Sequence, residues 1–158
     1  MPLIRYCTYT QTVTSKCKEQ TANEEYLGNN MNFVCNEISI SDEEFGCTVT
    51  FSEQEEGNDF ENQKTVDEIM DSIGQYVMLQ RTYGEDEFEE DYYYLETSDF
   101  EKSGELDDFD IILTETKFVL TTETDKYEIQ IHPDRQIFDD LKSVLSKITE
   151  CKGKLNIL

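Results

Sequence analysis

Apolar and polar residues alternate most clearly in segment 45–51, FGCTVTF. A period of two residues is typical of a strand with one buried face. The preceding stretch 31–40, MNFVCNEISI, predicts another strand, and segment 41–44, SDEE, predicts the turn between them. We therefore expect a hairpin, followed by a polar, acidic loop over residues 52–63.

A short helix is predicted to begin near Thr65, because Thr65 and Glu68 have the spacing of a capping box. Apolar residues at positions 66, 69, 70 and 73 follow at helical spacing, and Gly74 stands where such a helix ends. The helix leads directly into the apolar run that starts at Tyr76.

The segment 76–96, YVMLQRTYGEDEFEEDYYYLE, combines two short runs rich in Tyr and Val with an acidic stretch between them. Such runs predict strands, and Gly84 gives the connection turn freedom. In the second strand, Tyr93 is expected to point to one face and Tyr92 and Tyr94 to the other. We expect Arg81 to form an internal salt bridge with the loop.

Three runs, at 109–113, 117–122 and 126–132, alternate in the same way, with breaks of only a few residues, and predict an antiparallel meander. Pro133 and Asp134 are suited to the start of a helix. The apolar residues from Ile137 to Ile148 then recur at helical spacing, and Gly153 is expected to stop the helix.

These elements predict an α+β fold. We expect an antiparallel sheet of about seven strands, a short helix before the central hairpin and a C-terminal amphipathic helix packed on the sheet. The length of 158 residues fits one domain, which we place at 31–158. Residues 1–30 are predicted to be a polar N-terminal arm.

The formal net charge of −23 is concentrated in one part of the chain. Residues 30–110 contain 25 acidic and three basic residues, whereas residues 1–29 have a net charge of 0 and residues 111–158 of −1. This distribution argues against halophilic adaptation, which spreads acids over the whole surface. It also argues against membranes and direct nucleic-acid binding, because no basic stripe is present to neutralise phosphates. A basic protein partner is favoured.

Five cysteines are present, and none forms a C-x-x-C pair. With no positively charged, apolar leader at the start of the chain, the expected state is reduced thiols in a cytoplasm. No apolar run approaches the roughly 20 residues that a membrane span requires.

Enzymatic motifs are not apparent. His132 is the single histidine, so a zinc site is not predicted, and no glycine-rich phosphate loop or G-x-S-x-G sequence occurs. Hard oxygen ligands for calcium are plentiful, but the acidic segments lack the order of an EF-hand loop. We predict neither catalysis nor a cofactor.

The acidic loop has two interpretations. It is either a solvated connection that aids solubility or a surface presented to a basic partner, and its position between two core strands favours the second. Tyrosines beside it are a residue type enriched at interface hot spots. The predicted partner-binding residues are Glu85, Asp86, Glu87, Glu89, Glu90, Asp91, Tyr92, Tyr94, Asp107 and Asp108.

Several segments together resemble the immunity protein 10 family of bacterial polymorphic toxin systems. They are YVMLQR at 76–81, the acidic EDEFEED that follows, YYYLE from Tyr92, and the later IILTETKFVLT and FDDLKSVLSKI. The resemblance covers roughly residues 31–149. It implies a non-catalytic antidote that binds and neutralises a cognate toxin domain in the producing cell.

Two alternative functions would use the same acidic residues. A DNA-mimic inhibitor of a nucleic-acid-binding protein needs carboxylates spaced like duplex phosphates over a long surface. A calcium-binding module needs them gathered around one ion.

Overall fold

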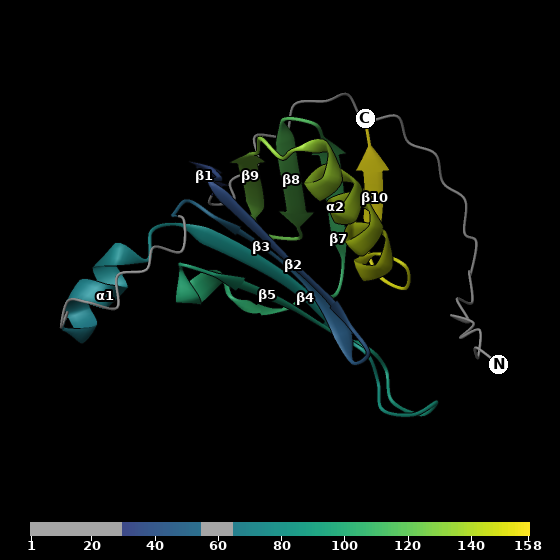
Figure 1. Ribbon diagram of the computed structural model, residues 1–158. Coiled ribbons are helices and arrows are strands. Elements are labelled where there is room, and N and C mark those ends of the chain that lie inside the picture. Colours follow the sequence, from purple (N-terminus) through teal and green to yellow (C-terminus); the bar gives the residue numbers. More distant parts are fainter. Residues whose placement is uncertain (1–29, 55–64) are drawn as a thin grey trace, which may run out of the picture.

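The computed structural model describes residues 30–54 and 65–158 and has an α+β fold (Figure 1). These residues form ten strands in two five-stranded sheets, together with two α-helices and one short 3-10 helix, η1 (Phe100–Lys102). The proposed N-terminal arm, 1–30, lies outside the described residues except for Asn30, which opens the first strand. Most of the predicted acidic loop 52–63 also lies outside them.

Sheet B is antiparallel throughout and has the order β2-β3-β4-β5-β6. Its strands are β2 (Glu37–Glu43), β3 (Gly46–Ser52), β4 (Tyr76–Thr82), β5 (Tyr92–Thr97) and β6 (Gly104–Glu105). Alternate residues of β3, β4 and β5 are buried, as a period of two requires. The strand pairs around the acidic segment are therefore those that the alternation predicts.

Sheet A has the order β1-β9-β8-β7-β10. Its strands are β1 (Asn30–Val34), β7 (Phe109–Thr114), β8 (Lys117–Thr122), β9 (Lys126–Gln130) and β10 (Lys154–Ile157). The meander β7-β8-β9 is confirmed. Parallel strands complete the sheet on both sides, β1 beside β9 and β10 beside β7.

The prediction of one antiparallel sheet of about seven strands is wrong, because the strands divide between two sheets. The expected single strand 31–40 is in fact two strands that separate at Cys35 and Asn36. The Cys35 N–H donates to the carbonyl of Gln130 in sheet A (2.8 Å), and the Asn36 N–H donates to that of Ser52 in sheet B (2.9 Å). The apolar positions shift from odd numbers (Met31, Phe33, Cys35) to even numbers (Ile38, Ile40) at this point, where Asn36 and Glu37 follow each other as two polar residues. The turn also comes later than predicted, since β2 continues through Glu43.

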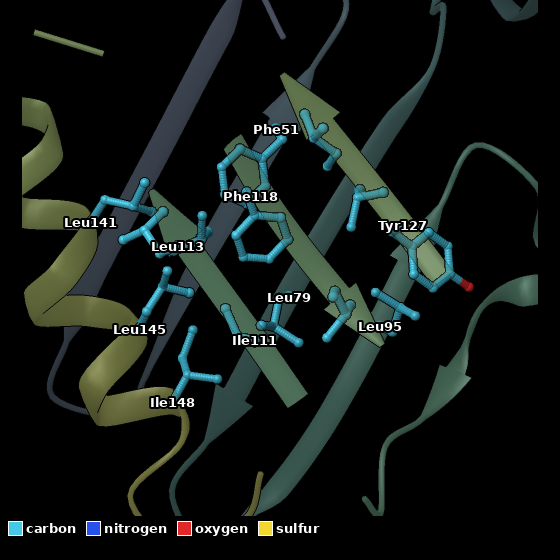
Figure 2. Packing of buried hydrophobic residues seen from close by; sticks show 14 of the residues in the cluster. Phe51, Leu79, Leu95, Ile111, Leu113, Phe118, Tyr127, Leu141, Leu145 and Ile148 are labelled. Atoms are coloured by element: carbon cyan, nitrogen blue, oxygen red, sulfur yellow. The ribbon is translucent and has the colours of Figure 1, made fainter. Parts of the chain in front are cut away.

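The core lies between the two sheets. The rings of Phe51 on β3 and Phe118 on β8 stack with centroids 4.3 Å apart, and both side chains are fully buried. Figure 2 shows these rings facing each other among the leucines and isoleucines of both sheets. Burying this much apolar surface is the main source of stability in such a fold.

Helix α2 (Arg135–Ile148) begins as predicted. The Asp134 carboxylate accepts a hydrogen bond from the Ile137 N–H (2.8 Å), which caps the first turn. The apolar stripe is buried at Leu141, Val144, Leu145 and Ile148, and Figure 2 shows three of these side chains directed toward Ile111 and Leu113 of β7. The helix packs against β2, β3 and β10.

The end of α2 differs from the prediction, because the helix stops at Ile148 with Thr149 as its C-cap and does not continue to Gly153. Gly153 has a φ of 79°, in the left-handed region that favours glycine, and precedes β10. The sequence pattern did not predict β10.

Helix α1 (Val66–Ser72) confirms the capping box. The Thr65 N–H donates to the Glu68 carboxylate (2.7 Å), and the Glu68 N–H donates to the Thr65 hydroxyl (3.3 Å). Val66 and Ile69 are exposed and do not join the core, and α1 projects from the body of the protein in Figure 1.

The described cysteines differ in state. Cys35 and Cys47 are buried free thiols, and burial raises the pKa of both. Cys151 is disulfide-bonded, so the expectation of reduced thiols is wrong for this residue. Neither of the two described α-helices is long and apolar enough to cross a lipid bilayer.

Candidate partner-binding surface

The acidic segment forms the connection between β4 and β5 and projects beyond the end of sheet B (Figure 1). Five of its six carboxylate residues are exposed; they are Glu85, Asp86, Glu87, Glu89 and Glu90. The structure therefore brings these predicted site residues together on one loop, with their charged groups in contact with solvent.

Hydrogen bonds within the loop fix its shape. The Phe88 N–H donates to the Asp86 carboxylate two residues earlier (2.8 Å), and the Glu85 N–H donates to the Glu89 carboxylate (3.2 Å). Gly84 lies against the backbone of Glu89, so closely that a Cβ on Gly84 would overlap the Glu89 carbonyl. Glycine is required here for the close approach of two backbone segments.

Arg81 holds the base of the loop. Its side chain is buried, and its Nε and one terminal nitrogen donate to the same Asp91 oxygen at 2.9 and 2.6 Å. The other terminal nitrogen donates to the Glu150 carboxylate (3.2 Å) and to the carbonyl of Lys147. The predicted internal salt bridge between Arg81 and the loop is confirmed.

The surroundings of Arg81 keep it charged. Burial alone lowers the pKa of the guanidinium, but its hydrogen bonds to the carboxylates of Asp91 and Glu150 outweigh this effect and hold this pKa above its ordinary value. The ring of Tyr83 also lies 5.0 Å from the guanidinium, at cation–π distance. Arg81 thus connects the loop, β4 and the C-terminal end of α2.

Asp91 has a different position from the other five acids. Only 14% of its side chain is exposed, and its second oxygen accepts a hydrogen bond from the Gly84 N–H (3.0 Å). We therefore assign Asp91 to holding the loop in place, whereas the five exposed carboxylates form its outer surface.

The three tyrosines at the start of β5 divide between the two faces as predicted. Tyr93 is buried, while Tyr92 and Tyr94 lie on the outer face of sheet B, with ring centroids 6.1 Å apart and Tyr92 46% exposed. The hydroxyl of Tyr93 is buried and has no hydrogen-bond partner among the described residues.

Asp107 and Asp108 belong to another connection, between β6 and β7, and both are exposed. The Asp107 carboxylate lies 3.3 Å from the ammonium of Lys152, which lies 5.3 Å from the ring centroid of Tyr93. This contact places Asp107 near the base of the loop and offsets part of its charge.

Sequence reasoning missed the neighbour of the loop, which is the turn between β2 and β3. The Tyr83 N–H donates to the Phe45 carbonyl in that turn (2.9 Å), so the two connections lie side by side. Phe45 and Phe88 are 73% and 86% exposed. We call the turn 42–45 and the loop 83–91 together the acidic end.

The sequence did contain a signal that Phe88 is exposed: it stands within a run of acids, and a phenylalanine outside a strand has no evident place in the core. The position of Phe45 gave no such signal, since it extends the alternation of β3. One acid of the acidic end is neutralised within the protein, because the carboxylate of Asp42 forms an ion pair with the ammonium of Lys147 in α2.

In the described part of the chain, no three His, Cys, Asp or Glu side chains are grouped so that they could hold a metal ion. We assign no calcium site to this surface.

No family model, curated protein or solved structure matches the chain. The resemblance to the immunity protein 10 family therefore stays a prediction based on the short segments given above. The geometry of the acidic end is the main structural basis for a functional proposal.

Proposed function

We propose that this protein is a non-catalytic antidote that binds a basic toxin domain through its acidic end and neutralises it. The observation that carries the proposal is the loop 83–91, a connection anchored by Arg81 and Gly84 that presents five exposed carboxylates and one exposed phenylalanine. Such a surface attracts a basic partner over a distance and offers an apolar contact at its centre.

A loop that binds a partner through exposed charges needs buried contacts at its base to hold it in place. A loop whose shape is fixed before binding loses less conformational entropy when it meets its partner. The ion pair of Arg81 with Asp91 and the close contact of Gly84 with Glu89 provide that preorganisation. A loop that served only solubility has no need of either contact.

Tyr92 and Tyr94 extend the proposed contact onto the outer face of sheet B. Stacked, half-exposed tyrosines supply large contact area at a low entropic cost. Asp107 and Asp108 remain at the periphery of the proposed interface. We propose the cytoplasm of the producing cell as the compartment, since an antidote of this kind acts where its toxin is made; the disulfide at Cys151 is the observation that speaks against it, because disulfides are rare in the cytosol.

The test begins with capture of the partner from the cells that make the protein. The bait is washed at about 0.1 M and then about 1 M salt, between which the screening length falls from roughly 10 to 3 Å. The captured protein is then expressed in a host with and without this protein. Growth arrest that is relieved by co-expression supports the proposal; a captured partner with no toxicity contradicts it.

The site is tested with a variant in which five loop carboxylates become amides. Its substitutions are Glu85→Gln, Asp86→Asn, Glu87→Gln, Glu89→Gln and Glu90→Gln. The matched control changes five exposed acids elsewhere, at Glu101, Glu105, Asp110, Glu115 and Asp140. We expect only the loop variant to lose protection; equal loss in both variants would assign the effect to net charge alone.

Competition with duplex DNA separates this proposal from a DNA mimic. If DNA displaces the partner from the acidic end, the partner's nucleic-acid groove is the occupied surface. If DNA has no effect, the carboxylates contact a different basic region of the toxin.

A further inference from the structure

Strand β2 forms one edge of sheet B. Within residues 30–54 and 65–158 it pairs with β3 along all seven of its residues, from Glu37 to Glu43, and no strand pairs with its other side. An unpaired edge presents a row of backbone donors and acceptors, which proteins either protect or use to bind another strand.

The register identifies which backbone groups point outward. The Glu53 N–H donates to the Gln75 carbonyl, and the Tyr83 N–H donates to the Phe45 carbonyl. These two bonds lie at the two ends of the β3–β4 ladder, so the odd-numbered residues of β3 are the ones hydrogen-bonded to β4. Hydrogen bonding alternates along an antiparallel strand, so even-numbered β3 residues face β2 and bond to its odd-numbered residues. The N–H and C=O groups of Ile38, Ile40 and Asp42 therefore point away from the sheet.

The side chains along this edge differ between the two faces. Ile38 and Ile40 lie on the inner face, partly buried against the core. Ser39 and Ser41 lie on the outer face, opposite Thr50 and Thr48, and both are exposed. The same outer face carries Glu37 and Glu43 at the two ends of the strand.

Acidic residues make this edge selective. Many proteins block an edge with lysine or proline, and β2 contains neither; α2 packs against β2, where Lys147 pairs with Asp42, so Glu43 supplies the outward-facing charge at this end of the strand. Antiparallel pairing of β2 with a second copy of itself would bring acids of one copy near those of the other, in a protein of net charge −23. The carboxylates thus oppose self-association but favour a strand that carries positive charge.

We infer that β2 is a docking edge for an extended, basic segment of a partner protein, which adds to sheet B as a sixth strand. Side chains on one face of that segment are lysine or arginine and lie beside Ser39, Ser41 and Glu43. Side chains on its other face are apolar and lie beside Ile38 and Ile40. The inference goes beyond the proposed function, because it concerns the edge of sheet B, which shares only Asp42 and Glu43 with the acidic end, and does not require the partner to be a toxin.

The probe is a short peptide of alternating lysine and valine, tested on the full chain by amide hydrogen exchange. We expect the peptide to slow exchange at the amides of Ile38, Ile40 and Asp42 by at least about tenfold. A peptide whose backbone is N-methylated at alternate positions, with the same charge, is expected to give no protection. A peptide with glutamate in place of lysine is expected not to bind.

The matched variants are Ser39→Lys with Ser41→Lys, and Gln130→Lys with Asn156→Lys. Each pair adds two positive charges at exposed strand positions, the first on β2 and the second on sheet A. We expect the first pair to weaken peptide binding by about tenfold more than the second, because its charges lie beside the bound strand.

Three results would overturn the inference. They are protection confined to loop 83–91, binding of the N-methylated peptide with full affinity, and pairing of two copies through β2 without peptide. The first of these leaves the proposed role of the acidic end intact. Conversely, if the peptide adds to β2 but the loop carboxylates prove dispensable for protection against the toxin, the inference about β2 stands and the proposed role of the acidic end fails.

Discussion

The β4–β5 and β7–β8 hairpins each join two neighbouring antiparallel strands of the core, yet their connections differ greatly. In the β7–β8 hairpin, Thr114 pairs with Lys117 across a tight turn of Glu115 and Thr116. This turn is closed by a hydrogen bond that the Thr116 N–H donates to the Thr114 hydroxyl (3.3 Å). By contrast, Thr82 pairs with Tyr92 across residues 83–91, which carry six carboxylates.

A hairpin of this fold can therefore be closed with two residues. The longer connection adds entropy loss and electrostatic repulsion that the sandwich itself does not require. The buried ion pair of Arg81 with Asp91 nevertheless anchors the base of the loop. This difference is the physical argument for a binding role, and the following experiments test it.

The largest effect is expected for Arg81→Ala. Removing the buried guanidinium takes away the hydrogen bonds that Arg81 donates to Asp91 and to the Lys147 carbonyl, and breaking such a buried pair destabilises a fold by about 3–5 kcal/mol. Urea unfolding measures the change. The control is Lys117→Ala, which removes a half-exposed pair with Glu128 and is expected to lose at most about 1 kcal/mol. Equal stability of Arg81→Ala and the native protein would show that the loop does not depend on this contact.

Gly84→Ala is expected to have the next largest effect, since its Cβ overlaps the backbone of Glu89. Steric overlap of this kind destabilises by about 1–3 kcal/mol. Gly104→Ala is the matched control, because a Cβ on Gly104 has no atom within 4 Å. The denaturant midpoint should fall for the first variant only; a loop that rearranges freely would give the same midpoint for both.

The five-amide loop variant is expected to be more stable than the native protein at low salt, by about 1 kcal/mol, because it removes repulsion between neighbouring carboxylates. The gain should disappear near 1 M salt, where exposed charges are screened. Glu115→Gln in the short β7–β8 turn is expected to leave the free energy of unfolding unchanged at both salt concentrations. A loop variant that is less stable than the native protein would mean that the acids contribute to the fold.

The smallest effect concerns pH. Hydrogen bonding to Lys117 lowers the pKa of Glu128 below its usual 4.5. A lowered folded-state pKa contributes stability above the unfolded-state value, and this contribution is lost as pH falls through the folded-state pKa. For a partly exposed pair we expect only a few tenths of a kcal/mol. The measured quantity is the difference in unfolding free energy between the native protein and Glu128→Gln, which should shrink from pH 7 to pH 3.

Local patterns predicted the local structure well. The alternation in β7, β8 and β9, the capping box at Thr65 and the N-cap at Asp134 all depend on residues close in sequence, and all are confirmed. Arg81 was identifiable as an internal partner because it is almost the only base in an acidic region. The division of Tyr92 and Tyr93 between faces followed from the period of a strand.

Long-range relations were not predictable in the same way. The parallel pairings of β1 with β9 and of β10 with β7 join residues far apart in the chain, and no local pattern encodes them. The change of sheet after Cys35 is marked only by two consecutive polar residues, Asn36 and Glu37, so two strands resembled one. Phe45 likewise gave no sign that the turn 42–45 lies beside loop 83–91.

The parallel pairings also determine the order in which the chain can fold during synthesis. Hairpins β2-β3-β4-β5 can form as soon as they leave the ribosome, because their contacts are between successive segments. Sheet A cannot be completed until β9 and β10 have been made. We therefore expect the inner face of sheet B, including Val49 and Leu79, to remain uncovered on the nascent chain, and full-length folding to be slow for a protein of this size.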